Sequence, residues 1–147
     1  DLTKDKDALK RVIDGLEAKG GTYTQQGIEK AAEILKRASA EHKKVMIVVS
    51  DGEPTYQKIE GAWLNDAPYI VGHRIAVSEK AKGKGLGAYI IQQAEEKAIT
   101  QGIHSIRVDT NFDNYIMKHI LAKQGYLYCG IIQVRDGNRE AFQKILK

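Results

Sequence analysis

The apolar positions in the first fifty residues predict two helices followed by one buried strand. Their spacing of three and four residues is typical of amphipathic helices over about 5–18 and 24–38. The next apolar run, residues 45–49, is continuous and rich in β-branched side chains, as expected of a strand buried on both faces. Turn-forming residues over 50–54 end this strand. The first segment is therefore expected to have the order helix, helix, strand.

The remainder of the chain alternates strand and helix patterns. Helices are predicted over about 87–101 and from the capping residue Asn114 to Gly125, each with one apolar face. A turn at 136–138 joins the last two strands. Together with the strand at 45–49, the pattern predicts an α/β (α+β) fold: a single mixed sheet of about five strands with helices on both faces. The other four strands are expected at 69–77, 103–109, 128–134 and 140–146.

Composition narrows the class of protein. The 147 residues, 42% hydrophobic and 29% charged, are typical of one soluble globular domain over 1–147. No apolar stretch reaches the roughly 18 residues of a membrane span, and the first residues lack the layout of a signal peptide. The single cysteine, Cys129, excludes an internal disulfide and favours a cytoplasmic setting. The net charge of +4 is too small for a nucleic-acid-binding surface, so neither nucleic acid nor membrane is expected as a partner.

The segment with evident chemistry is the glycine-rich stretch 80–87, Lys-Ala-Lys-Gly-Lys-Gly-Leu-Gly, which directly precedes a predicted helix. A glycine loop at a helix N-terminus presents backbone amides and a positive dipole end, which together favour a phosphate or pyrophosphate. The stretch lacks the Gly-Lys-Ser/Thr ending of nucleotide triphosphatases, and no acidic residue follows where a dinucleotide site needs one. An anion site and an ordinary glycine-rich turn both fit these residues.

The stretch Tyr69–Ser78, together with this loop, resembles the acetyl-CoA-binding motif of the GNAT N-acetyltransferase superfamily. Lys82 takes the place of the family's Arg or Gln, and Gly85 and Gly87 take the places of its two glycines. The resemblance continues through 109–114, 123–126 and 128–132 and covers about 54–147. It implies a GNAT-like C-terminal half and acetyl-CoA or CoA as the small-molecule ligand.

The resemblance also implies a set of cofactor-binding residues. The strand edge formed by Ile75, Ala76 and Val77 would pair with the pantetheine arm of CoA, and the glycine loop would hold the pyrophosphate. Asn114 falls on the family's asparagine before the fourth helix. The implied cofactor-binding residues are Ile75, Ala76, Val77, Lys82, Gly83, Lys84, Gly85, Leu86, Gly87 and Asn114.

The catalytic residues stay unassigned at this stage. Leu121 occupies the position where the family often has a tyrosine general acid, four residues before the Gly-Phe pair. Tyr115, Tyr128 and Cys129 could replace it, but packing roles for these three carry more weight. Glu53, Glu60 and His73 are the nearby candidates for a base, and their spacing singles out none of them.

The first segment resembles a different family. Leu9–Asp51 is similar to a von Willebrand factor A domain in two motifs, Gly20–Thr24 and Val48–Glu53. By that resemblance Thr22 and Asp51 would be two members of a metal-ion-dependent adhesion site. The site also needs an Asp-x-Ser-x-Ser segment, which the sequence lacks, so no metal is expected.

These two resemblances together predict a chimera, with an α-α-β piece over 1–53 replacing the acceptor side of an acetyltransferase over 54–147. The strand at 45–49 would then lie beside the strand at 69–77. The expected function is an engineered or recombined protein that retains the CoA loop without efficient catalysis. The alternative is an active GNAT-type N-acetyltransferase that transfers acetyl to an amine. An exposed sheet edge would favour a homodimer.

Overall fold

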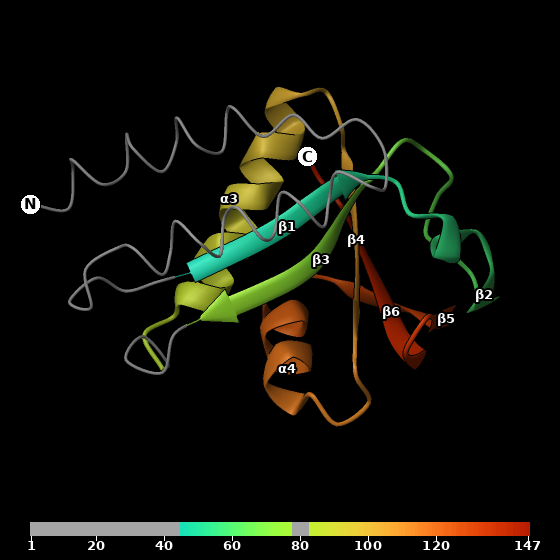
Figure 1. Ribbon diagram of the computed structural model, residues 1–147. Helices are drawn as coiled ribbons and strands as arrows, with labels where there is room; N and C mark the ends of the chain where they lie inside the picture. The colour runs from blue at the N-terminus through green and yellow to red at the C-terminus, as the bar shows by residue number, and fades with distance from the viewer. Residues whose placement is uncertain (1–44, 78–82) are drawn as a thin grey trace, which may run out of the picture. The chain divides into compact units, whose positions relative to one another are not determined.

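The structure, a computed structural model, describes residues 45–77 and 83–147 (Figure 1). The chain divides into two units, residues 1–42 and 43–147, and every described residue belongs to the second unit. The predicted helices over 5–18 and 24–38 lie outside the described residues, as do Thr22 and Lys82. Their predicted roles therefore stay predictions.

The described unit is built around a six-stranded mixed sheet with the strand order β1-β3-β4-β6-β5-β2. The β3–β4 pair is parallel, and the other neighbouring pairs are antiparallel. This agrees with the predicted mixed sheet. The elements are β1 (Val45–Asp51), the short 3-10 helix η1 (Pro54–Gln57), β2 (Ile59–Gly61), β3 (Ile70–Val77), α3 (Leu86–Thr100), β4 (Ser105–Thr110), α4 (Tyr115–Lys123), β5 (Leu127–Val134) and β6 (Gly137–Ile145).

The sixth strand, β2, is the one that the sequence pattern did not predict. Its three residues are too few to show an alternating pattern, and a tertiary contact places it beside β5. Gly61 pairs with Gly130, and a Cβ on Gly130 would lie 2.1 Å from the backbone oxygen of Glu60. The two backbones approach so closely only because both residues are glycines.

The pairing of β1 with β3 confirms the predicted neighbour of the first strand. The two strands run antiparallel from Val45 opposite Val77 to Asp51 opposite Ile70. A strand from the first resemblance segment is therefore part of the same sheet as the strands of the second segment.

Helices α3 and α4 pack on one face of the sheet. Ile106 and Val108 of β4 point to this face, since they share one core with the buried residues of both helices. The predicted apolar faces are buried: Ile90, Ile91, Ala94, Ala98 and Leu121 are buried, and Met117 and Ile120 pack against the core as partly buried residues. No helix in the described part of the chain is long and apolar enough to span a membrane.

The other face is covered in the described unit by η1 and by residues 62–69. Tyr56 of η1 packs here with Val71 and stacks on Trp63. The Arg107 guanidinium lies between the Trp63 and Tyr69 rings, 4.2 Å and 3.8 Å from their centres. Helices on this second face are a prediction for residues that the structure does not describe.

Two local predictions have different outcomes. Asn114 caps α4 as expected, because its side chain accepts a hydrogen bond from the Met117 amide at 3.1 Å. The predicted turn at 136–138 is wrong by one residue, since Val134 already pairs with Gly137. The turn residues are Arg135 and Asp136, and Gly137 (φ 119°) begins β6.

Candidate functional site

The parallel pair β3–β4 is joined over a short length only. Ile70, Val71 and Gly72 of β3 pair with Ile106, Arg107 and Val108 of β4. Beyond Gly72 and Val108 both strands continue, β3 to Val77 and β4 to Thr110, and no further pair joins these two described strands. Figure 1 shows β3 and β4 diverging toward the end of β3. We call this place, just beyond the Gly72–Val108 pair, the strand opening.

A β-bulge lies at the same point on the other edge of β3. Val48 of β1 pairs with Arg74, but the next residue, Val49, pairs with Gly72. His73 is therefore an extra residue on β3 that has no partner position on β1. Bulges interrupt the hydrogen-bond ladder and redirect a side chain, and they are frequent next to active sites.

The glycine loop precedes α3 near the end of β3 (Figure 1). Gly83 and Gly85 both have φ of 72°, and a Cβ at either residue would meet nothing within 4 Å. These glycines are therefore required by backbone conformation and not by lack of space. Gly85 is the N-cap of α3 and provides no side-chain cap, so the first amides of the helix are directed into the loop.

Gly87 also has a packing role in the helix-side core. It is a residue of α3, and a Cβ there would lie 3.2 Å from the Cδ1 atom of Ile120 in α4. The absence of a side chain at Gly87 allows the two helices to approach each other. The role of Gly87 among the predicted cofactor-binding residues stays a prediction.

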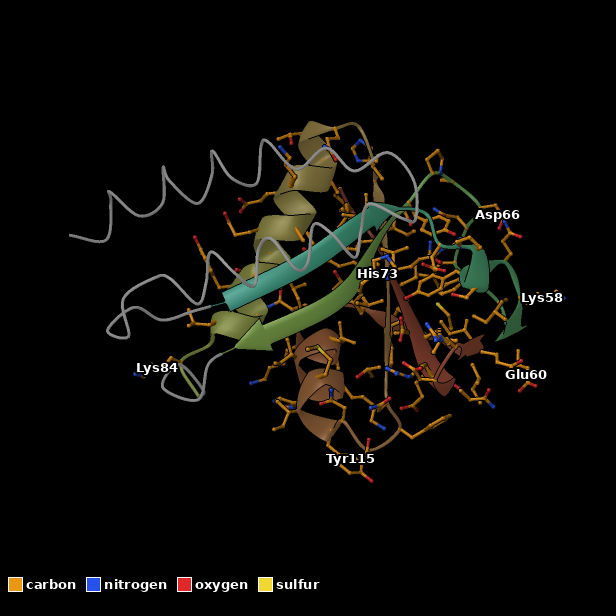
Figure 2. The ribbon with its side chains drawn as sticks, viewed as in Figure 1. Lys58, Glu60, Asp66, His73, Lys84 and Tyr115 are labelled. Carbon is orange, nitrogen blue, oxygen red and sulfur yellow. The ribbon has the colours of Figure 1, made fainter. Side chains whose placement is uncertain are left out.

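The other predicted cofactor residues that the structure describes belong to the end of β3 or to the starts of the helices that follow β3 and β4. Residues 75–77 form the end of β3 beyond its last pair with β4, and Ile75 also packs against the helix-side core. Lys84 is exposed in the loop (Figure 2), and Leu86 is the first residue of α3. Asn114 caps α4, the helix that follows β4. The helices that follow β3 and β4 thus both begin at the carboxyl ends of this parallel pair, where ligands bind in α/β sheets.

The fold brings two of the three candidate bases together and places the third elsewhere. The Nε2 atom of His73 lies 3.8 Å from Oε2 of Glu53, and the side chains are 24% and 25% exposed. Glu53 is fixed by capping η1, because its Oε1 accepts hydrogen bonds from the amide and the hydroxyl of Thr55. Glu60 instead lies on β2 at the far edge of the sheet (Figure 2). The structure therefore brings His73 and Glu53 together and excludes Glu60.

Tyr56 and Asp109 form a second pair beside the strand opening, which sequence reasoning missed. The Tyr56 hydroxyl donates a 2.5 Å hydrogen bond to Oδ1 of Asp109, the residue that follows Val108. Burial raises the pKa of Tyr56 far above its ordinary value, and the Asp109 carboxylate raises it further. Arg139 lies 3.7 Å from the other oxygen of Asp109. No spacing in the sequence relates residues 53 positions apart, so no sequence signal indicated this pair.

The candidate general acids do not gather at the opening. Leu121 is fully buried in the helix-side core. Tyr115 is 73% exposed at the start of α4, and the Tyr128 ring contacts Phe142 edge-on. The Cys129 thiol donates to the Leu127 carbonyl, and burial raises its pKa. The geometry therefore assigns no proton donor among these residues.

The metal-site prediction concerns residues that are described only in part. Asp51 is the last residue of β1, opposite Ile70, while Thr22 lies outside the described residues. Within 45–77 and 83–147, no group of three or more His, Cys, Asp and Glu side chains could hold a metal ion.

The sheet order, the strand opening and the helix-side core define a GNAT-like fold, and comparison with known proteins agrees. Residues 54–126 match the model of the acetyltransferase (GNAT) family, and residues 1–53 match that of the von Willebrand factor type A domain. The chain is similar to a GNAT-family acetyltransferase from Streptococcus agalactiae, with a TM-score of 0.66 and 29% identity. That similarity covers 99% of this chain and 86% of the other. The predicted fold class is thereby confirmed.

Structures of lower identity show the same fold. Ard1 from Thermoplasma volcanium is similar at a TM-score of 0.59 and 17% identity, over 98% of this chain and 93% of the other. A NatC complex bound to Gag peptide and CoA is similar at a TM-score of 0.61 and 14% identity. This similarity covers 96% of this chain and 90% of the other. Another acetyltransferase is similar at a TM-score of 0.50 and 17% identity. That match covers 69% of this chain but only 47% of the other protein. No curated protein sequence matches the chain significantly.

Proposed function

We propose that this protein is a GNAT-type N-acetyltransferase that transfers an acetyl group from acetyl-CoA to an amine. The strand opening is the observation that carries the proposal: β3 leaves β4 at Gly72, at the site of a β-bulge, and ends near the glycine loop. The match of residues 54–126 to the acetyltransferase family and the 29% identity to a GNAT-family enzyme support it.

The residues around the opening fit the parts of acetyl-CoA. The amides of the loop 83–87 and the dipole of α3 would hold the pyrophosphate, with Lys84 adding positive charge. The amide groups of the pantetheine arm would pair with the edge of β3 over residues 75–77, where β4 no longer does. When bound, acetyl-CoA would supply an activated acetyl carbonyl.

A recombined scaffold that binds CoA without efficient transfer is the second candidate. It is favoured by the two family matches, which adjoin between Glu53 and Pro54, and by Leu121 in the place of a tyrosine acid. The sheet is compatible with recombination of two segments, since β1 belongs to the first match and its partner β3 to the second. Wild-type turnover separates the two candidates.

The test of donor binding uses two glycines at opposite ends of α3. Gly85 and Gly102 have φ of 72° and 73°, and a Cβ at either residue would meet nothing within 4 Å. Alanine should therefore cost each about 1–2 kcal/mol of stability through left-handed strain. Only Gly85→Ala should weaken CoA binding, by roughly tenfold, which corresponds to about 1.4 kcal/mol. Calorimetric titration with CoA and acetyl-CoA measures this.

The outcomes of this experiment separate the proposals. Saturable binding that only Gly85→Ala weakens, with acetylation of spermidine, a lysine peptide or a peptide α-amine, is the expected result. Binding without transfer to any of these amines favours the recombined scaffold. Absence of saturable binding at millimolar CoA would overturn both candidates.

The homodimer stays a prediction, and we propose β1 as the edge that would form it. β1 and β2 are the outer strands of the described sheet. β2 is only three residues long, carries the exposed Glu60 and directly follows the exposed Lys58, and such charges protect an edge from pairing with another strand. Sedimentation velocity at several concentrations would detect the dimer. The cytoplasmic setting likewise stays a prediction.

A further inference from the structure

We propose that the guanidinium of Arg139 binds a carboxylate of the acceptor, so that the acceptor is an amine that also carries a carboxylate, as an amino acid does. This inference deepens the proposed function and rests on it. Arg139 is a residue of β6 and lies outside the residues that sequence patterns singled out. Three observations point to it: its place beside the strand opening, its unused hydrogen-bond donors and the charges of its neighbours.

Arg139 lies beside the strand opening on the face of the sheet opposite α3 and α4. Its partner on β5 is Ile132, which belongs to the core on the η1 side, and directly paired residues of antiparallel strands share a face. The Nη1 atom of Arg139 lies 3.7 Å from Oδ2 of Asp109, the residue of β4 next to Val108. The Arg139 side chain therefore reaches the region where β3 and β4 separate, from the η1 side of the sheet.

The η1 side of the opening is the side left for the acceptor. The glycine loop and the first amides of α3 would hold the donor, and α3 packs with α4 on the other face of the sheet. Transfer needs donor and acceptor to be held close together at one point of the sheet. An acceptor that reaches the opening from the η1 side would meet Arg139.

The guanidinium of Arg139 has donors that the chain does not use. It carries five N–H groups, and within the described residues none of them makes a hydrogen bond, because its contact with Asp109 is longer than one. The side chain is nevertheless only 25% exposed. By contrast, Lys118, Lys144 and Arg107 each donate a hydrogen bond of 2.6–2.8 Å. The planar fork of an arginine matches a carboxylate, so Arg139 is suited to bind one.

The charges near Arg139 restrict the kind of ligand. Burial first, and then the charges of Asp109 and Glu53, raise the pKa of the Tyr56 hydroxyl, which places both carboxylates near this hydroxyl. These two carboxylates would repel a ligand that carries negative charge alone. A polyamine would leave the Arg139 guanidinium without a partner. A ligand with both an amine and a carboxylate is attracted at both ends.

The kinetic test compares matched acceptors in matched variants. Glycine, β-alanine and γ-aminobutyrate are each paired with the primary amide, which retains the amine and lacks the negative charge. In at least one pair, wild-type kcat/KM should be about 10- to 100-fold higher for the carboxylate, as expected of a charge-assisted hydrogen bond. Arg139→Gln should bring this ratio close to unity. Comparing variants cancels differences in amine basicity within a pair.

Two further variants control for charge and for folding. Arg135→Gln removes the same charge from an exposed residue of the same hairpin and should leave the ratio within about twofold of wild type. Arg139→Lys retains the charge without the planar fork and should keep part of the ratio. An arginine that only stabilises the fold would affect the carboxylate and the amide equally, so the ratio would not change.

A second measurement does not depend on turnover. Calorimetric titration with the N-acetylated products of the same pairs, with and without CoA, gives the Kd of each. The carboxylate product should bind wild type about tenfold more tightly than the amide product, and Arg139→Gln should abolish this difference.

Each outcome decides for or against the inference. Equal kcat/KM and equal product binding for carboxylates and amides in wild type would overturn it and leave the proposed function in place. So would a carboxylate preference that Arg135→Gln removes as fully as Arg139→Gln, because the overall charge of the hairpin would then be responsible. Failure of the wild-type protein to bind acetyl-CoA overturns the proposed function itself and is detected before any variant is made.

Discussion

The two edges of β4 are organised differently. On one edge all six residues, Ser105–Thr110, pair with β6 in an uninterrupted antiparallel ladder. On the other edge only the first part of the strand pairs with β3, and the partners then diverge. One strand thus has a closed edge and an open edge.

The difference shows how one strand can complete its ladder on one side and leave it incomplete on the other without losing its place in the sheet. Along the closed edge, the ladder and buried side chains from both faces stabilise the pair. At the open edge, the ladder stops and side chains replace it: Tyr56 reaches Asp109, and Glu53 reaches His73. The open edge is therefore held by side-chain contacts, and the closed edge by a complete backbone ladder.

The largest expected effect comes from breaking the closed edge at Gln143. This fully buried residue of β6 donates to Ser105 Oγ and Asn65 Oδ1 and accepts from the Leu64 amide, at 2.7–2.9 Å. Gln143→Leu keeps the side-chain volume but removes the hydrogen bonds to these partners. Each buried polar group left without a partner costs about 1–3 kcal/mol of stability. We expect urea unfolding to show a loss of about 3 kcal/mol in the free energy of unfolding, with an unchanged m value.

The matched control for this prediction is Gln133→Leu, at an exposed glutamine on β5. It should change stability by less than about 0.5 kcal/mol. A loss below 1 kcal/mol for Gln143→Leu would contradict the view that the closed edge depends on this buried network.

Local sequence signals predicted the closed parts of the fold well. The inward faces of α3 and α4 and the Asn114 cap follow from spacing over a few residues, and all are present. The strand β2 could not be predicted, because its place depends on the contact between Gly61 and Gly130. Local patterns carry no information about such distant contacts.

The candidate site was predictable only where it is local. The left-handed Gly83 and Gly85 follow from a glycine-rich loop before a helix. The significance of His73 depends on the register of β1 against β3, and that of Asp109 on a partner in η1. Both relations arise from tertiary pairing, so local spacing could not single out His73 among the candidate bases and gave no signal for Asp109.

An intermediate effect is expected from removing a side-chain link at the open edge. Tyr56→Phe deletes one hydrogen bond to a carboxylate, which should cost about 1.5–3 kcal/mol at pH 7. The pKa of Tyr56 is raised in the folded state, so its contribution is complete below the unfolded pKa of about 10 and is lost as pH rises above it. The difference between wild type and Tyr56→Phe should narrow by about 1.4 kcal/mol per pH unit above pH 10.

Tyr126→Phe is the control for this pH dependence. Burial and Glu95 raise the pKa of Tyr126 as well, but it lies in the helix-side core, away from the open edge. Urea unfolding between pH 7 and pH 11 should show, for both variants, the same narrowing of the difference in unfolding free energy from wild type. Only Tyr56→Phe should also change acetyl-CoA turnover. A pH-independent difference for Tyr56→Phe would mean that the phenol does not hold its proton in the folded state.

The smallest expected effect comes from Gly87→Ala, where α3 meets α4 beside the open edge. Alanine in a helix interior gains up to about 1 kcal/mol over glycine, which offsets crowding by the Ile120 methyl group at 3.2 Å. We expect a net change within about 0.5 kcal/mol and, because the new methyl points to α4, a Kd for CoA within twofold of wild type. Adding Ile120→Val should relieve the crowding and make Gly87→Ala stabilising. If Gly87→Ala instead weakened CoA binding as strongly as Gly85→Ala, Gly87 would contact the ligand and not only Ile120. The binding site would then include the first turn of α3 as well as the open edge.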